Sequence, residues 1–134
     1  MKKFTLLYFI VTAFQLFSLS KSNGQACPTL VWQDEFDGNA LNATNWNIST
    51  GNGCPSLCGY GNNELQSYEA ANLTVSNGTL KILAKQENIG GANYSSGKIT
   101  SKDKAKFTYG RYEARIKLPK GDGLWPAFWM LSND

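Results

Sequence analysis

The hydrophobic pattern separates the first 26 residues from the rest of the chain. Lys2 and Lys3 precede an apolar run from Phe4 to Leu19, and polar residues follow at positions 21–24. This layout is typical of a secretory signal peptide. The run is short and interrupted by polar residues, so it suits poorly a helix that crosses a hydrocarbon core of roughly 30 Å. We therefore predict a signal peptide at 1–26 and a secreted region at 27–134, located extracellularly, in the periplasm or on the outer surface.

The residue after the predicted cleavage site leaves a second route of export open. Small residues at positions 24 and 26 suit cleavage near Ala26, whereas a lipoprotein would carry its lipid on Cys27. No apolar residue directly precedes Gln25 and Ala26, and this favours free secretion.

After position 26 the pattern changes to short β-type segments separated by turns. Residues 29–36, 72–78, 79–87, 94–102, 107–118 and 126–131 are rich in β-formers, and no long amphipathic helix is visible. Asn77-Gly78 between two apolar runs is a strong hairpin signal. Several short strands with regular turns predict an all-β sandwich or barrel.

The segment 109–118 has the clearest alternation. Neighbouring side chains on a strand point to opposite faces. One face would carry Arg111, Glu113, Arg115 and Lys117, and the other face would carry apolar residues. The charged row is either a solvated outer face or one side of a polar groove, and alternation alone favours the solvated face.

Charge and composition exclude several classes of function. Lys2, Lys3 and Lys21 account for the formal net charge of +3, so residues 27–134 are formally neutral. A nucleic-acid-binding domain would carry a strongly basic surface, and the neutral balance of residues 27–134 argues against this class. The chain contains no histidine, so it cannot form a Ser-His-Asp centre, a Cys-His centre or a His-ligated zinc site.

The three cysteines suggest one disulfide in an exported chain. Cys54 and Cys58 enclose three residues in a Gly-rich stretch and are the natural pair. A C-x₃-C pair of zinc ligands is the alternative, but no second pair follows. Cys27 has no evident partner in the sequence.

Four strings in this order and spacing resemble glycoside hydrolase family sixteen, specifically its laminarinase-like endo-β-1,3-glucanases. They are LVWQDEFDG, GYGNNELQSY, FTYGRYEARIKLP and GLWPAFWML, and they span Leu30 to Leu131. The resemblance implies an all-β, β-jelly-roll sandwich of the concanavalin A-like lectin and glucanase type. Residues 27–134 would then be the N-terminal part of a truncated catalytic domain.

The resemblance also implies a retaining mechanism with two carboxylates about 5–5.5 Å apart. In the family these acids come from one strand with the pattern E-x-D-x-x-E, and this sequence contains no such triplet. We therefore assign no catalytic residue and expect the acids beyond Asp134. We expect the fragment itself to be inactive.

What the resemblance assigns to this segment is substrate binding. Asn62 and the pair Glu113 and Arg115 match cleft residues that hydrogen-bond sugar hydroxyls, which reverses the preference for a solvated face. Trp129 and Trp125 match aromatic residues of the cleft floor, although core packing is the alternative for both. Arg111 and Glu64 are weaker candidates, and Glu64 is equally compatible with a structural pairing.

The resemblance further implies a structural calcium ion but no cofactor for catalysis. Many members bind calcium through main-chain carbonyls that match Glu35 and Gly78 and through a later aspartate, which this chain lacks. Carbonyl oxygens suit this hard cation. The CPSLC insert departs from the family pattern and lies beside Asn62, so it is expected to border the cleft.

The expected function is endo-hydrolysis of laminarin-type β-1,3-glucan by the secreted full-length protein. A non-catalytic β-glucan recognition protein, a mixed-linkage β-1,3-1,4-glucanase and, last, a purely structural β-domain are the alternatives. The expected partner is a β-glucan polysaccharide. We expect neither a nucleic-acid partner nor stable membrane insertion after signal cleavage.

Overall fold

The computed structural model describes residues 28–132. The predicted signal peptide and Cys27 lie outside these residues. Residues 28–33 belong to one unit, and Asp34 begins the second unit, which contains every helix and strand described below. Among residues 28–132, no helix is long and apolar enough to span a bilayer.

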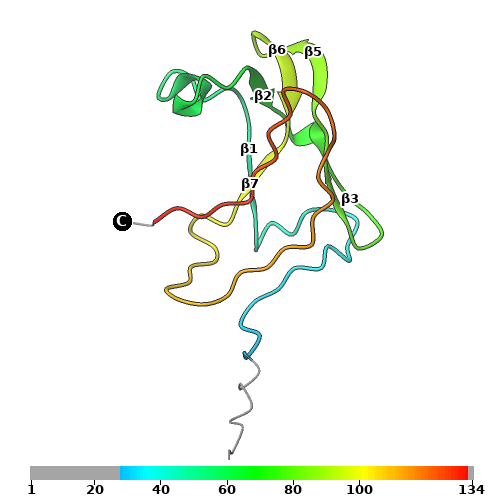
Figure 1. Cartoon of the computed structure of the whole chain (residues 1–134), viewed down its shortest axis with the longest axis vertical. Coiled ribbons are helices and arrows are strands. Elements are labelled where there is room, and N and C mark those ends of the chain that lie inside the picture. Colours follow the sequence, from blue (N-terminus) through cyan, green and yellow to red (C-terminus); the bar gives the residue numbers. More distant parts are fainter. Residues whose placement is uncertain (1–27, 133–134) are drawn as a thin grey trace, which may run out of the picture. The chain divides into compact units, whose positions relative to one another are not determined.

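The described part of the chain is all-β apart from two short 3-10 helices (Figure 1). In chain order the elements are β1 (Asn47–Ser49), η1 (Cys58–Gly61), β2 (Gln66–Tyr68), η2 (Ala70–Asn72), β3 (Leu73–Val75), β4 (Leu80–Ile82), β5 (Lys85–Ile89), β6 (Ala92–Ser96) and β7 (Lys98–Thr100). The predicted all-β class is therefore correct.

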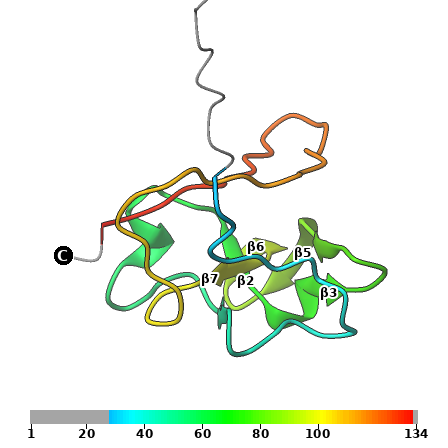
Figure 2. The same ribbon diagram turned by 90° about the horizontal axis from the view of Figure 1, so that it is seen from below.

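The strands form three small sheets (Figures 1 and 2). β1 pairs antiparallel with β7, and β3 pairs antiparallel with β4. β6 is the central strand of the third sheet, parallel to β2 and antiparallel to β5. The parallel pair requires a crossover, and the chain from η2 to β5 provides it.

The hairpin between β3 and β4 confirms the turn predicted from Asn77-Gly78. Ser76 and Thr79 exchange backbone hydrogen bonds of 3.0 and 3.1 Å across this two-residue turn. Asn77 and Gly78 have φ values of 52° and 65°, the left-handed conformations that a type I′ turn requires. The turn pairs Val75 with Leu80 in the first register position.

The most buried side chains of the described residues are mainly polar. Val75 is 5% exposed, whereas Ser67, Asn72 and Ser95 are essentially inaccessible. Asn72 Nδ2 donates to Ser95 Oγ at 2.7 Å, and Ser95 Oγ donates to Glu87 Oε1. These bonds connect η2 to the central sheet and satisfy donors that burial would otherwise leave without a partner.

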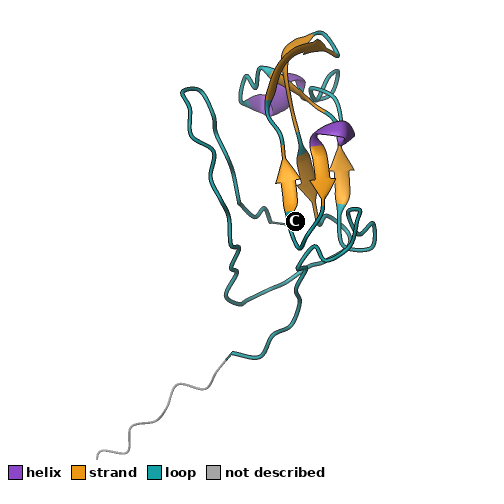
Figure 3. Cartoon of the chain, turned by 90° about the vertical axis from the view of Figure 1, so that its right-hand side faces the viewer, coloured by secondary structure: helices purple, strands orange, loops and turns teal. Residues whose placement is uncertain are grey.

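Three predicted strands are absent from the structure, and those predictions were wrong. Residues 29–36 contain no strand, and at their end the Asp34 carboxylate accepts a 3.0 Å bond from the amide of Phe36, which has a left-handed φ of 55°. The segments 107–118 and 126–131 also contain no strand, as Figure 3 shows. Residues 108–131 form no backbone–backbone hydrogen bond with any described residue, so no ladder exists there.

Candidate functional site

The Gly-rich loop before β2 positions Asn62, the first of the predicted binding residues. Asn62 follows η1, and its amide donates to the Gly59 carbonyl at 2.9 Å. Glu64 N donates to the same carbonyl at 3.1 Å. The Asn62 residue is exposed, so this turn presents its side chain to solvent and to any ligand.

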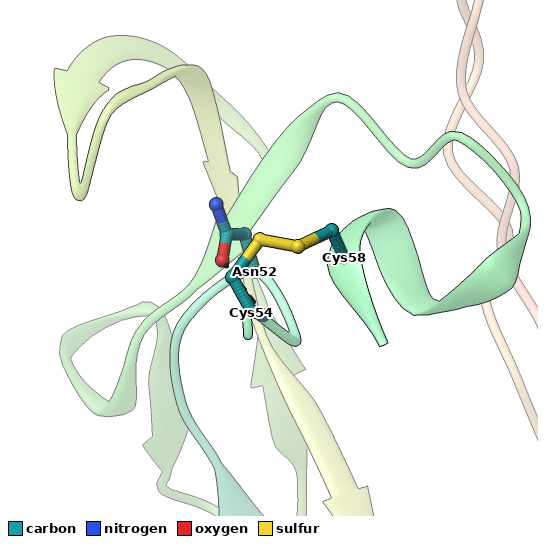
Figure 4. Close-up of a disulfide and its surroundings, with 3 residues drawn as sticks. All are labelled: Asn52, Cys54 and Cys58. Atoms are coloured by element: carbon teal, nitrogen blue, oxygen red, sulfur yellow. Dashed lines mark hydrogen bonds between the residues drawn. A yellow bond between two sulfur atoms is a disulfide. The ribbon is translucent and has the colours of Figure 1, made fainter. Parts of the chain in front are cut away.

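The disulfide loop lies directly before this turn. Cys54 and Cys58 are joined by an S–S bond of 2.03 Å, so the alternative of a zinc ligand pair does not apply (Figure 4). The Cys54 amide donates to Asn52 Oδ1 at 3.1 Å. Among the described residues, no group of three or more His, Cys, Asp or Glu side chains is placed to hold a metal ion.

The predicted pair Glu113 and Arg115 lies in the segment without strands. Both residues are exposed, and Glu113 Oε1 pairs with Arg111 Nη2. The structure therefore joins Arg111 to Glu113. It does not join Asn62 to Glu113 or Arg115 by any hydrogen bond or ion pair within residues 28–132.

The two predicted cleft tryptophans are exposed. Trp125 is 93% exposed and Trp129 is 60% exposed, so neither packs in a core of the described residues. Phe128, Met130 and Leu131 beside them are also exposed. This arrangement leaves the rings accessible, but it does not bring them against Asn62 or Glu113 through any ring contact in the described part.

A polar and aromatic cluster beside the Gly-rich loop was missed by sequence reasoning. Tyr68 OH donates to Glu64 Oε2 at 2.7 Å, and Gln66 Nε2 donates to the same oxygen at 3.1 Å. Lys98 Nζ lies 3.9 Å from the centre of the Tyr60 ring and 5.2 Å from that of Tyr68. An ammonium group over an aromatic ring makes a cation–π interaction, because the ring face attracts the positive charge.

The sequence contained a signal for half of this cluster. Residues 64, 66 and 68 alternate along β2 and its approach, so their side chains share one side. Lys98 lies on β7, and no local sequence pattern indicates its contact with this cluster. Glu64 has the structural pairing that the sequence left open.

Burial and hydrogen bonding shift the pKa values of two described residues, Tyr68 and Asp34. Burial, together with the acceptor and charge of Glu64, raises the pKa of Tyr68 to about 12. Burial alone would raise the pKa of Asp34, but hydrogen bonds from Asn45, the Phe36 amide and Trp46 together lower it. Asp34 accepts from Asn45 Nδ2 at 3.0 Å and from Trp46 Nε1 at 2.8 Å.

Oxygen atoms gather at the turn predicted to contribute to a calcium site. A side-chain carbon built on Gly78 would lie 3.5 Å from Asp37 Oδ1 and 3.8 Å from the Glu35 carbonyl oxygen. The two residues named from the resemblance, Glu35 and Gly78, are thus neighbours. A carbonyl and a carboxylate oxygen are ligands of the kind that calcium prefers.

The comparisons with known proteins identify the family. A family model described as β-glucan synthesis-associated protein SKN1/KRE6/Sbg1 matches residues 14–134. The chain belongs to this family. The glucan endo-1,3-β-glucosidase A1 of Niallia circulans is 46% identical over 117 residues, which cover 78% of this chain and 17% of that protein.

Solved laminarinases are similar to this SKN1/KRE6/Sbg1 family member in fold as well as sequence. The laminarinase from Flavobacterium sp. UMI-01 is 45% identical with a TM-score of 0.54, over 61% of this chain and 34% of that chain. The laminarinase catalytic domain from Thermotoga maritima MSB8 is 36% identical with a TM-score of 0.57, over 61% and 35%. The resemblance to laminarinase-like enzymes and the β-jelly-roll class are therefore confirmed, and the chain spans about a third of each laminarinase.

Proposed function

We propose that this chain is the glucan-binding part of a secreted endo-β-1,3-glucanase that acts on laminarin-type β-glucan. The observation that carries the proposal is the 46% identity to a glucan endo-1,3-β-glucosidase across 78% of the chain. The exposure of Glu113, Arg115 and Trp129 supports it, because side chains that contact a polysaccharide must be accessible.

In this proposal the binding residues and the catalytic acids lie in different parts of the protein. Asn62, Glu113 and Arg115 hydrogen-bond sugar hydroxyls, while Trp125 and Trp129 lie against the apolar faces of pyranose rings. The two carboxylates of the retaining mechanism come from an E-x-D-x-x-E strand beyond Asp134. The absence of this triplet from the sequence and the one-third coverage of the laminarinase chains support that division.

The test is hydrolysis by the full-length secreted protein. Laminarin should yield a ladder of oligosaccharides, lichenan should be cleaved less and agarose should remain intact. The proton signal of the newly formed reducing end should show the retained anomer first. Release of glucose alone, a preference for lichenan or agarose, or an inverted first product would contradict the proposal.

A second candidate is a non-catalytic β-glucan protein. Two observations favour this candidate. The family that matches this chain is described as β-glucan synthesis-associated, and the sequence lacks the E-x-D-x-x-E triplet. It predicts that the full-length protein binds laminarin in a pull-down without releasing reducing sugar. The endo-glucanase predicts both binding and release.

The calcium site is part of the same proposal. The Glu35 carbonyl, the Gly78 carbonyl and Asp37 would hold the ion, and its charge would fix the turn between β3 and β4 against the segment around Glu35. A chelator should lower the melting temperature of the full-length protein, and added calcium should restore it. An unchanged melting temperature would contradict the calcium site.

A further inference from the structure

A groove of about 340 Å³ separates the disulfide loop from the tip of the β5–β6 hairpin. Its lining includes Cys54 and Cys58 of the disulfide loop, Gln66 of β2, and Asn93 and Tyr94 of β6. Its volume is at the lower end of the range of roughly 300–1,000 Å³ that is usual for small-ligand sites. The groove is therefore large enough for a small ligand.

The floor of the groove is fixed by the register of the central sheet. Gln66 pairs with Tyr94 across β2 and β6, and Ser67 pairs with Ser95. The two serines are buried, so the alternation of the strands turns Gln66 and Tyr94 toward the opposite face. Gln66 is also held by bonds to Glu64 and to Tyr68 OH at 3.0 Å.

The disulfide loop forms a rigid wall of the groove. The Leu57 amide donates to the Gly53 carbonyl at 2.7 Å, and the Gly59 amide donates to the Asn52 carbonyl at 2.8 Å. A side-chain carbon on Gly53 would lie 2.2 Å from the Leu57 carbonyl oxygen, so the loop closes on itself without space for one. The Cys54–Cys58 bond ties the two ends of this loop together (Figure 4).

Several polar groups in the groove are available to a ligand. Asn52 Nδ2 points away from Cys54 in Figure 4, whereas the Oδ1 atom of the same side chain accepts the Cys54 amide. Within residues 28–132, the Tyr94 hydroxyl forms no side-chain hydrogen bond. Tyr94 is 42% exposed, so its ring is accessible as well as its hydroxyl.

The chemistry of the groove suits a neutral sugar. Glu64 is the only charged residue among the described residues that line it, and its carboxylate already accepts bonds from Gln66 and Tyr68. Within residues 28–132, no cationic side chain lines it to attract a phosphate or a sulfated sugar. Amide donors and acceptors bind hydroxyls, and an aromatic ring packs against the apolar face of a pyranose.

We propose that this groove is an outer subsite that binds one glucose unit of the β-glucan chain, and that the disulfide holds its wall in place. The inference rests on the proposed glucanase function and adds a specificity determinant to it. The groove adjoins Asn62, which follows Gly59 by three residues, so a long glucan can reach both. Short oligosaccharides should not reach this subsite.

The test compares kcat/KM of the full-length protein on a long and a short laminari-oligosaccharide. Tyr94→Phe should reduce kcat/KM for the hexasaccharide by roughly two- to tenfold, the range for one neutral hydrogen bond. It should not change kcat/KM for the trisaccharide. Cys54→Ser/Cys58→Ser should give the same selective loss, as should a reducing agent on the wild type.

Asn88→Ala is the matched control. Asn88 lies on β5 in the same hairpin and is exposed, but it does not line the groove. It should behave as wild type on both substrates. Tyr94→Phe removes only a hydroxyl and keeps the ring, so it should leave the hairpin folded.

The outcomes separate this inference from the proposed function. A wild-type protein that cleaves neither oligosaccharide overturns the proposed function, and the inference with it. Cleavage by the wild type with equal kcat/KM values for the groove variants overturns the groove alone. Equal losses on the hexasaccharide and the trisaccharide would also overturn it, because they would indicate damage to the whole cleft.

Discussion

The β3–β4 hairpin and the segment 107–118 differ in where their hydrogen-bonding partners lie. Leu73 to Val75 pair with Leu80 to Ile82 across a two-residue turn, so the ladder closes within ten residues. Residues 108–118 have no such partner among the described residues, and Tyr109 is 93% exposed. A strand whose partner is adjacent in sequence forms from local information, whereas a strand with a distant partner depends on the rest of the fold.

The same difference separates the candidate binding residues. Asn62 belongs to a loop closed by its own backbone bonds and by the disulfide. Glu113 and Trp129 belong to the segment that lacks a ladder. The groove beside Asn62 is therefore formed in this chain, while the tryptophan part of the proposed cleft is only exposed.

The prediction with the largest expected effect tests whether the segment around Glu113 needs residues beyond Asp134 to form strands and to complete an active enzyme. A chain of residues 27–134 should release no reducing sugar from laminarin, because the proposed function places both catalytic carboxylates beyond Asp134. Full-length protein prepared in parallel should be active. Hydrogen exchange should show amides 108–131 unprotected in the short chain and protected in the full-length protein, as expected for strands that gain a ladder.

Two results would contradict this prediction. Activity of the short chain above a mock preparation would mean that the catalytic acids lie within residues 27–134. Unprotected amides 108–131 in the active full-length protein would mean that this segment is a loop in the enzyme as well.

The prediction with the next largest effect tests whether the exposed segment 107–131 binds glucan. In the full-length protein, Glu113→Ala and Arg115→Ala should each cost about 1.5–3 kcal/mol, or roughly tenfold or more in kcat/KM on laminarin. Trp129→Ala should cost at least as much through lost stacking. Lys117→Ala is the matched control, because Lys117 belongs to the same charged row but is not assigned to the cleft.

Melting temperatures measured on the same variants separate binding from folding. Glu113→Ala and Arg115→Ala should melt like the wild type, because both residues are exposed. Wild-type kinetics for both variants would make the charged row a solvated face. That result would remove Glu113 and Arg115 from the proposed cleft.

The hairpin, the disulfide and the fold class could be predicted because each depends on neighbouring residues. Asn77-Gly78 specifies its turn by its own conformational preference, and Cys54 and Cys58 are only four positions apart. Charged and apolar residues alternate in 107–118, but alternation does not supply a partner strand, and the structure has no strand there. Lys98 reaches Tyr60 across 38 positions, and no local pattern indicates such a contact.

A smaller effect tests how far the hairpin turn depends on glycine. Gly78→Ala should destabilise the full-length protein by about 1–2 kcal/mol, because Gly78 has a φ of 65° that L-residues rarely adopt. Gly38→Ala is the matched control, since no left-handed φ applies there and its added carbon would be 3.5 Å from the Ala40 carbonyl, an ordinary contact. Urea unfolding measures both. Equal stabilities of the two variants would show that the turn does not determine the hairpin.

The smallest expected effect contrasts Tyr68, held in the paired region, with the exposed Tyr109. Burial and the Glu64 carboxylate raise the pKa of Tyr68 to about 12, above the value of about 10 for an unfolded chain. The folded state therefore keeps this proton to higher pH than the unfolded state. The resulting stability is fully present below pH 10 and is lost as the pH rises toward 12.

Two variants locate this loss in the Tyr68–Glu64 bond. Tyr68→Phe should flatten the fall in urea stability between pH 10 and 12, because the variant has no proton to release there. Glu64→Gln should lower the pKa of Tyr68, measured from the phenolate absorbance as the difference from Tyr68→Phe. Tyr109→Phe, which removes an exposed hydroxyl, should leave the fall unchanged. Parallel curves for the wild type and Tyr68→Phe would show that the buried phenol does not contribute to the pH dependence, and the 2.7 Å bond to Glu64 would then have no measurable effect on stability.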